Sequence, residues 1–365
     1  MIPLPHSRWL SGVVLFAFTG IAVASTNSWS LRKWQMEDGL PNNTVTGIAQ
    51  TPDGYLWIAT PTRLARFDGA TFETIPRERF APSVTERIST LRCGRDGCLW
   101  LAVNHGPVIR IQPGAVQIFT NGLQNDKQVQ ALAEDGDSLW ISYKEGLVCH
   151  LRHGQGHVLK ASEGAPFGSV CSFATDGAGR LWYAKDGQFG IAQNDHFEPQ
   201  YAISRAPTCL SPSHDGGIWI CAGARLLKFN GHDAPRIVAQ FHPDMPRTEP
   251  TVMIEDRNGG VWVGTSDNGL LHFADGQFEN VPTSHRQILC LLEDNEGNIW
   301  AGTSGGGLDR IQREAISLEG TDKGLPFEAV QSICEDTNGT LWAVTQNGFV
   351  ASRTNGVWVT YDTNA

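Results

Sequence analysis

The sequence has almost no segment with the periodicity of an amphipathic helix, and after its first two dozen residues it has no long hydrophobic run. A membrane-spanning helix needs about 20 consecutive apolar residues, so we predict no membrane span in the mature chain. Positive charge is also scarce, because 28 Lys and Arg residues stand against 38 Asp and Glu residues. The formal net charge of −10 argues against a nucleic-acid partner, which would need a basic stripe.

Recognisable catalytic and cofactor motifs are missing as well. The chain has no glycine-rich phosphate loop, no nucleophile elbow, no HExxH sequence and no cysteine pair with zinc-ligand spacing. His153 and His157 flank two glycines at an expected hairpin tip, and we interpret them as solvated loop residues. We therefore expect no cofactor and no metal, and we predict that the protein is not an enzyme.

What the chain does have is a repeat marked by tryptophan. Eight tryptophans follow one another at intervals of 43, 40, 42, 37, 43, 38 and 42 residues, and seven of them have a glycine three residues earlier. Asp137 takes the place of that glycine in the third unit. A period near forty indicates repeated supersecondary units. The units centre on Trp57, Trp100, Trp140, Trp182, Trp219, Trp262, Trp300 and Trp342.

Each unit has the pattern of a four-stranded antiparallel sheet. In the sixth unit, 251–281, short β-rich runs alternate with turns such as Asn258–Gly260 and Ser266–Gly269. The 40 glycines and 19 prolines agree with a turn-rich chain. Because such sheets must bury both faces, we predict an all-β fold, a β-propeller of eight repeat units in one seven- or eight-bladed ring.

Repeated residues are expected to be structural, since a catalytic residue is needed once. We interpret the tryptophans as wedges between blades. The recurrent acid at the first turn should cap its own hairpin through bonds to the backbone. The acids are Asp176, Asp256, Asp294 and Asp336, and the basic residues that recur in the third strand are Arg66, Arg110, Lys228, His272 and Arg310.

Ring closure has two solutions in the sequence. Residues 28–34 read as a spare outer strand that can pair with the last blade and cover its edge. The eighth unit, however, already has a candidate outer strand at 356–361. Either all eight units close one ring with a strand displaced, or seven close and the eighth begins a second ring.

The first residues have the pattern of an export signal. Arg8 provides the positive charge, Val13 to Val23 a short apolar region, and Ala22-Val23-Ala24 a cleavage site. We predict a signal peptide at 1–24 cleaved after Ala24, a propeller over 25–365, and a periplasmic or secreted location. Cysteines in an exported protein favour disulfides. The two candidate pairs are Cys93 with Cys98 and Cys209 with Cys221.

Candidate binding residues lie where the repeats differ. By propeller geometry, the turns between second and third strands share one face with the connections between blades, around the channel mouth. Mixed charges and amides there suit a polar ligand such as an oligosaccharide or a peptide. The candidates are Arg63, His105, Lys144, Lys185, Arg225, Asp267, Asn268, His285, Arg286 and Asn347.

The motifs resemble those of the two-component regulator propeller repeat family. The resemblance rests on 38–45 (DGLPNNTV), 53–60 (DGYLWIAT) and 64–69 (LARFDG), with similar segments at 256–273 and 294–311, and it covers nearly all of the chain after residue 24. In that family such propellers form the periplasmic sensor half of membrane receptors, with a histidine kinase, hybrid kinase or diguanylate cyclase as output. No output domain is recognisable between 25 and 365, so no kinase or cyclase activity is assigned to any residue.

The resemblance implies a non-enzymatic ligand-sensing propeller of a two-component or cyclic-di-GMP receptor, truncated or acting with a partner such as a membrane-bound signalling protein. The alternative is an exported metal-dependent lyase resembling the virginiamycin-inactivating family, for which His105 and His285 are the candidate histidines. A quinone-dependent dehydrogenase propeller and a protein-interaction scaffold are further alternatives.

Overall fold

The computed structural model describes residues 29–81, 86–160, 171–242, 248–314, 319–354 and 356–361. These residues form eight four-stranded sheets, and the paired strands within them are antiparallel. The all-β prediction is therefore confirmed. The predicted signal peptide and its cleavage site lie outside the described residues. No helix in the described part of the chain has the length and apolarity needed to cross a bilayer.

Seven of the sheets are the blades of the ring, and each begins with its innermost strand. Blades 1 to 3 contain β2 (Gly47–Gln50), β3 (Leu56–Ala59), β4 (Leu64–Phe67) and β5 (Phe72–Ile75); β6 (Ile88–Cys93), β7 (Leu99–Val103), β8 (Val108–Gln112) and β9 (Ala115–Phe119); and β10 (Val129–Asp135), β11 (Ser138–Tyr143), β12 (Val148–Arg152) and β13 (Gln155–Val158).

Blades 4 to 6 contain β14 (Ser172–Thr175), β15 (Leu181–Lys185), β16 (Gln188–Gln193) and β17 (His196–Ala202); β18 (Thr208–Pro212), β19 (Ile218–Ala222), β20 (Arg225–Phe229) and β21 (Arg236–Gln240); and β22 (Pro250–Glu255), β23 (Val261–Thr265), β24 (Leu270–Ala274) and β25 (Gln277–Val281).

Blade 7 is β26 (Ile288–Glu293), β27 (Ile299–Thr303) and β28 (Leu308–Arg313), with β1 (Trp29–Trp34) as its fourth strand. The eighth sheet is β29 (Val330–Glu335), β30 (Leu341–Thr345), β31 (Val350–Thr354) and β32 (Val357–Tyr361). Among the described residues, short 3-10 turns occur at η1 (Met36–Asp38), η2 (Arg77–Arg79) and η4 (Thr321–Lys323).

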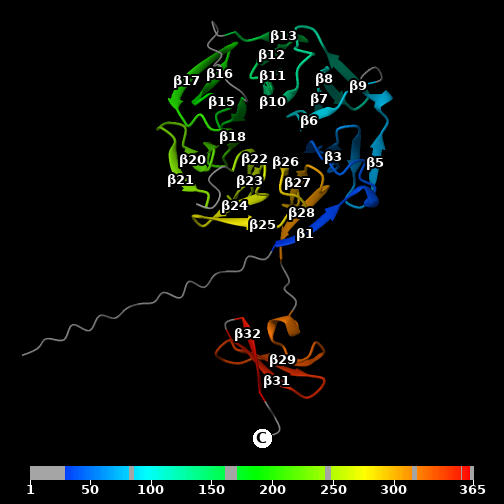
Figure 1. Ribbon diagram of the computed structural model, residues 1–365, viewed down its shortest axis with the longest axis vertical. Coiled ribbons are helices and arrows are strands. Elements are labelled where there is room, and N and C mark those ends of the chain that lie inside the picture. The colour runs from blue at the N-terminus through cyan, green and yellow to red at the C-terminus, as the bar shows by residue number, and fades with distance from the viewer. Residues whose placement is uncertain are drawn as a thin grey trace, which may run out of the picture.

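The ring closes with seven blades. The innermost strands of neighbouring blades contact one another from β2 through β26, and β26 contacts β2 again. Figure 1 shows these seven sheets around a common centre and the eighth sheet outside the ring. Of the two closures that the sequence allowed, the structure has the second: seven units close and the eighth keeps its own outer strand.

The N-terminal strand completes the last blade, as the sequence predicted. β1 pairs antiparallel with β28, with Trp29 opposite Arg313 and Trp34 opposite Leu308. Trp34 is 3% exposed and stacks on Trp300 at a ring-centroid distance of 5.3 Å. A strand from the start of the sequence thus covers the edge of a sheet built from residues 288–313.

The repeated acids are structural, and they do more than the sequence indicated. Asp294 accepts the backbone amides of Glu296 and Asn298 through Oδ1, both at 2.9 Å, which is the predicted hairpin cap. Its other oxygen, Oδ2, accepts the indole N–H of Trp300 at 2.6 Å. The same pairing joins Trp182 to Asp176, Trp262 to Asp256 and Trp342 to Asp336.

The recurrent basic residue of the third strand packs on the repeat tryptophan. Lys228 Nζ lies 4.2 Å from the centre of the Trp219 ring, and the His272 ring lies 4.3 Å from that of Trp262. The structural interpretation is therefore confirmed at these positions. In blade 1, Arg66 lies on Tyr55 instead, at 4.3 Å.

All eight cysteines are free in the structure, so neither candidate disulfide is present. Cys93 pairs in register with Leu99 rather than with Cys98, because the intervening turn is not centred between the two cysteines. Cys209 and Cys221 do lie directly opposite each other on β18 and β19. Burial raises the pKa of Cys209 to about 12, which keeps its thiol protonated.

Candidate functional site

The predicted mouth face exists as a geometric unit. Turns between second and third strands are hydrogen-bonded to the connections between blades: Gly269 N donates to Arg286 O at 2.7 Å, and His105 N donates to Lys127 O at 3.0 Å. Lys144 N likewise donates to Gln128 O at 2.9 Å. We call this side of the ring, made by both sets of loops, the mouth face.

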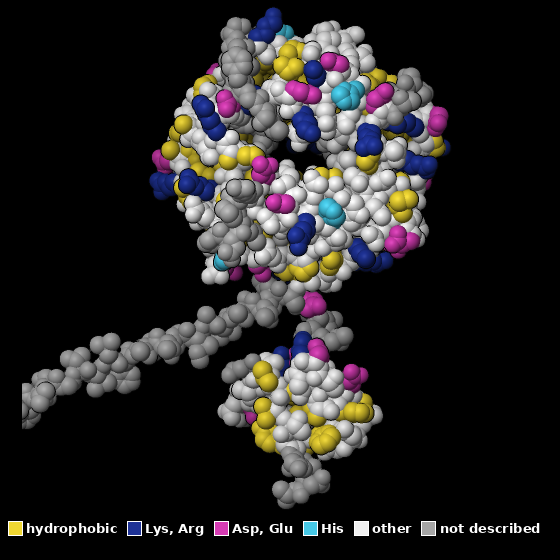
Figure 2. Space-filling model, viewed as in Figure 1, with side chains coloured by type: hydrophobic (Ala, Val, Ile, Leu, Met, Phe, Trp, Pro, Cys, Tyr) yellow, Lys and Arg dark blue, Asp and Glu magenta, His cyan; other side chains and the backbone are white. Residues whose placement is uncertain are grey.

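Most of the candidate binding residues lie exposed on the mouth face. Figure 2 shows the ring hollowed at its centre, with basic, acidic and histidine side chains around the opening. Amide groups and charged groups of both signs therefore surround a concave centre, which is suited to a polar ligand. The exposed candidates are Arg63, His105, Lys144, Arg225, Asp267, Asn268, His285 and Arg286.

Two candidates are not part of this exposed set. Lys185 ends β15 and is only 2% exposed, and burial lowers the pKa of its ammonium group. The sequence placed it in a loop because a turn follows directly, but the strand extends through it to pair with Gln188. Asn347 lies in the β30–β31 turn of the eighth sheet, outside the ring, where its side chain accepts the Thr345 hydroxyl at 2.6 Å.

The two histidines proposed for a lyase have backbone partners. His105 Nδ1 lies 2.7 Å from the carbonyl oxygen of Asp126, and the residue has a φ of 51°. His285 Nδ1 accepts the amide of Gln287 at 3.0 Å. Each contact involves Nδ1 of the ring. Both side chains are exposed.

A buried acid next to the mouth face escaped the sequence analysis. Asp309 is 0% exposed, its Oδ2 accepts the amide of Ser284 at 2.7 Å, and its Oδ1 has no partner among the described atoms. Burial raises the pKa of this carboxyl. A signal was available, because the equivalent positions of other units are apolar. They are Ala65, Ile109, Cys149, Gly190, Leu227, Leu271 and Ala351.

A Ser-His-Asp arrangement in blades 3 and 4 has a structural explanation. His150 Nδ1 lies 2.5 Å from Asp195 Oδ1, and its Nε2 lies 2.8 Å from Ser138 Oγ. The His150 ring is buried and stacks on Trp140 at 4.3 Å, which is the repeat position that His272 occupies in blade 6. Ser138 Oγ also contacts Asp135 O at 2.7 Å. The arrangement locks the third strand onto the repeat tryptophan.

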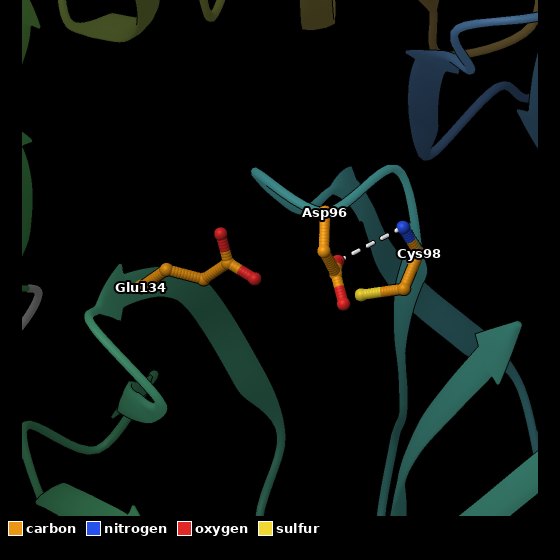
Figure 3. Close-up of side chains that lie close together, drawn as sticks. All are labelled: Asp96, Cys98 and Glu134. Carbon is orange, nitrogen blue, oxygen red and sulfur yellow. Dashed lines mark hydrogen bonds between the residues drawn. The ribbon is translucent and has the colours of Figure 1, made fainter.

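Three groups with metal-ligand chemistry, Asp96, Cys98 and Glu134, meet between blades 2 and 3 (Figure 3). Their ligand atoms already have protein partners. Arg110 bonds both Asp96 and Cys98 Sγ, the latter at 3.3 Å. Glu134 accepts the indole N–H of Trp100 at 2.7 Å and the amide of Arg95 at 2.8 Å. These contacts occupy ligand atoms of all three residues, and the bonds of Glu134 to Arg95 and Trp100 join the two blades.

Comparison with solved structures supports the propeller fold. The chain is similar to the extracellular domain of BT3049 from B. thetaiotaomicron, described as a hybrid two component system, with 21% identity and a TM-score of 0.68. The alignment covers 93% of this chain and 50% of that one, so the chain spans about half the length of that extracellular domain. The extracellular domain of BT4673 from the same organism gives 16% identity and a TM-score of 0.63, covering 93% and 48%.

The alternative family also has the same fold. Virginiamycin B lyase from Staphylococcus aureus is 14% identical with a TM-score of 0.65, covering 78% of this chain and 99% of the lyase. The sequence has no match among curated proteins. The family described as "Two component regulator propeller" matches residues 39–62, 283–305 and 324–347. These three segments, in blade 1, blade 7 and the eighth sheet, are therefore similar to the two component regulator propeller repeat.

Proposed function

We propose that the protein is the extracytoplasmic, ligand-sensing input of a signalling receptor. The matched repeats and the likeness to two extracellular sensor domains support this proposal. The predicted export signal fits a periplasmic or extracellular location. Signal output would come from a partner or from domains beyond the ones described.

The observation that carries the receptor proposal is the exposure of the eighth sheet. Ile333 in its first strand is 61% exposed, whereas Leu291 and Met253, at the same position in blades 7 and 6, are 7% and 5% exposed. Val330 is 40% exposed and its counterpart Ile288 is 0% exposed. Burying one such side chain contributes about 1.5–3 kcal/mol. We infer that the eighth sheet is the first blade of a further propeller-like unit that covers this face.

We propose that the ligand binds at the mouth face, with Asp267, Asn268, His285 and Arg286 as the contact residues of one sector. Polar groups of opposite sign there would hold a short peptide or an oligosaccharide by hydrogen bonds. The turn that carries Asp267 and Asn268 is pre-ordered, because the amide of Asn268 donates to Thr265 Oγ1 at 2.9 Å. Pre-ordering lowers the entropic cost of binding.

The test is a thermal-shift screen of the full chain against oligosaccharides, tripeptides and divalent metals. A ligand at 100 times its Kd should add about 2.7 kcal/mol to the free energy of unfolding. A saturable shift that disappears in the Arg286→Ala variant and persists in the Glu296→Ala variant supports the mouth face, because Glu296 is an exposed carboxylate in the first turn of blade 7, on the opposite face. A shift with metal alone, together with turnover of a streptogramin B antibiotic, contradicts the sensor proposal and favours the lyase.

A further inference from the structure

A cavity of about 690 Å³ opens at the boundary of blades 2 and 3, on the face opposite the mouth face. Its lining comes from the first turns of both blades, from the β12–β13 turn and from the outer strand β9. Trp100, Phe119, Leu139 and Leu151 provide its apolar and aromatic part, while Arg95 and Asp137 lie among the polar groups around it. Its volume is in the range of small-molecule sites.

Two departures from the repeat pattern border this cavity. The first turn of blade 3 is short, with Asp135 paired to Ser138 around Gly136 and Asp137, whereas the corresponding turn of blade 6 places five residues between Glu255 and Val261. Blade 2 has Gly94 where blades 4, 6 and 7 have the acid that binds the tryptophan, and blade 5 departs in the same way with Ser213. The Trp100 indole therefore donates across the boundary to Glu134. The repeats depart from their pattern on both sides of one cavity.

The inner polar groups are fixed and the outer ones are free to bind. Asp96 and Arg110 are paired with each other, and Glu134 holds the Arg95 amide and the Trp100 indole. The guanidinium of Arg95 and the carboxylate of Asp137 have no side-chain hydrogen bond or ion pair among the described residues, and both side chains are exposed. The cavity thus offers a free donor and a free acceptor beside an aromatic surface.

We propose that this cavity binds a neutral saccharide of one or two rings. Each sugar hydroxyl is both a donor and an acceptor, so it can use Arg95 and Asp137 together, while the C–H face of the ring can pack on Phe119. The charges around the cavity come close to balance, because Arg95 and Arg110 oppose Asp96, Glu134 and Asp137. This balance favours a neutral ligand over a strongly anionic or cationic one.

This site is separate from the one in the proposed function. The mouth face is built by second-to-third-strand turns and blade connections, and the cavity by turns at the other ends of the strands. Occupation of the cavity would bridge blades 2 and 3, which Glu134 already joins by two hydrogen bonds.

The test is an array of neutral glycans probed with the full chain, followed by calorimetry with cellobiose, maltose and any glycan that the array identifies. Asp137→Ala and Arg95→Ala should each raise the Kd at least ten-fold, because each removes a group that would bond the sugar hydroxyls. Both side chains are exposed, so neither substitution should affect folding. Glu296→Ala, an exposed carboxylate in the first turn of blade 7, is the matched control and should leave the Kd unchanged.

Two outcomes overturn the cavity proposal. One is the absence of binding by any neutral glycan, or binding only by uronic acids or amino sugars. The other is binding that Asp137→Ala and Arg95→Ala leave intact. If that binding is instead lost in the double variant Asp267→Ala/Asn268→Ala, the mouth face is the saccharide site and the sensor proposal stands. Loss in the cavity variants alone supports the cavity.

Discussion

Replacing Asp294 with alanine should destabilise the ring strongly, although the residue is one small side chain in a turn. The carboxylate accepts four hydrogen bonds: two backbone amides, the Asn298 side-chain amide at 2.7 Å and the Trp300 indole at 2.6 Å. Asn298 is 4% exposed and Trp300 is 2% exposed, so the donors of these two residues lie where water has little access.

The expected magnitude follows from the donors that would be left without a partner. Each unsatisfied buried donor costs about 1–3 kcal/mol, and a water molecule that fills the space of the carboxylate would recover part of this. We expect Asp294→Ala to lower the free energy of unfolding by about 3 kcal/mol, and the Tm by roughly 5 to 8 °C. Asp294→Asn should lose about 2 kcal/mol, because its amide N–H₂ would face the indole N–H.

The assay is equilibrium unfolding in guanidinium chloride, followed by far-UV circular dichroism and by tryptophan fluorescence. Asp53→Ala is the matched control, since Asp53 is an exposed turn carboxylate in blade 1 whose bonds reach only the neighbouring Thr51 and Tyr55. Asp53→Ala should lower the free energy of unfolding by about 0.5 kcal/mol. A free energy of unfolding of Asp294→Ala within about 1 kcal/mol of the wild type would refute the view that the acid–tryptophan pair stabilises the blades that contain it.

Three further predictions concern burial and protonation. Asp309→Asn should raise the Tm at pH 7 and change it little below pH 3.8. Burial raises the pKa of Asp309 in the folded state. The stability contributed by its protonated form is therefore present below the unfolded pKa and is lost as the pH rises through the folded pKa. An equal Tm change at both pH values would contradict this. Leu291→Ser should lower the free energy of unfolding by about 3 kcal/mol, whereas Ile333→Ser, at the equivalent position of the exposed eighth sheet, should lower it by less than about 0.5 kcal/mol. Equal losses in denaturant titrations would mean that the eighth sheet is packed like a blade. Iodoacetamide should label the exposed Cys334 in the native protein and spare Cys171, Cys209 and Cys290, whose pKa values burial raises to about 12; peptide mass spectrometry showing the reverse order would refute the burial pattern.

The repeat made the fold predictable from sequence, because the same tryptophan, glycine and turn residues return in phase. The sequence also identified Asp294 and its equivalents as hairpin caps, but their bond to the indole depends on a side-chain direction that spacing does not give. Ring closure could not be decided, since both β1 and β32 have the pattern of an outer strand, and only pairing with β28 separates them.

The site was less predictable than the fold. Lys185 looks like a loop residue in sequence and is buried at the end of β15. The cavity between blades 2 and 3 arises from a shortened turn and a missing acid, each of which was visible as a departure at Asp137 or Gly94 but not as a shape. Whether loops converge depends on the distance between neighbouring blades, and a single sequence does not give that distance.

The most direct test of the sensor account is a calorimetric titration of the full chain with the oligosaccharide or tripeptide that gives the largest thermal shift. The mass of that compound is then measured before and after incubation with the protein, with and without Mg²⁺. The account predicts saturable binding at one or both sites with the compound recovered unchanged. Conversion of the compound to a product that depends on the protein and the metal would contradict the account and make the chain an enzyme.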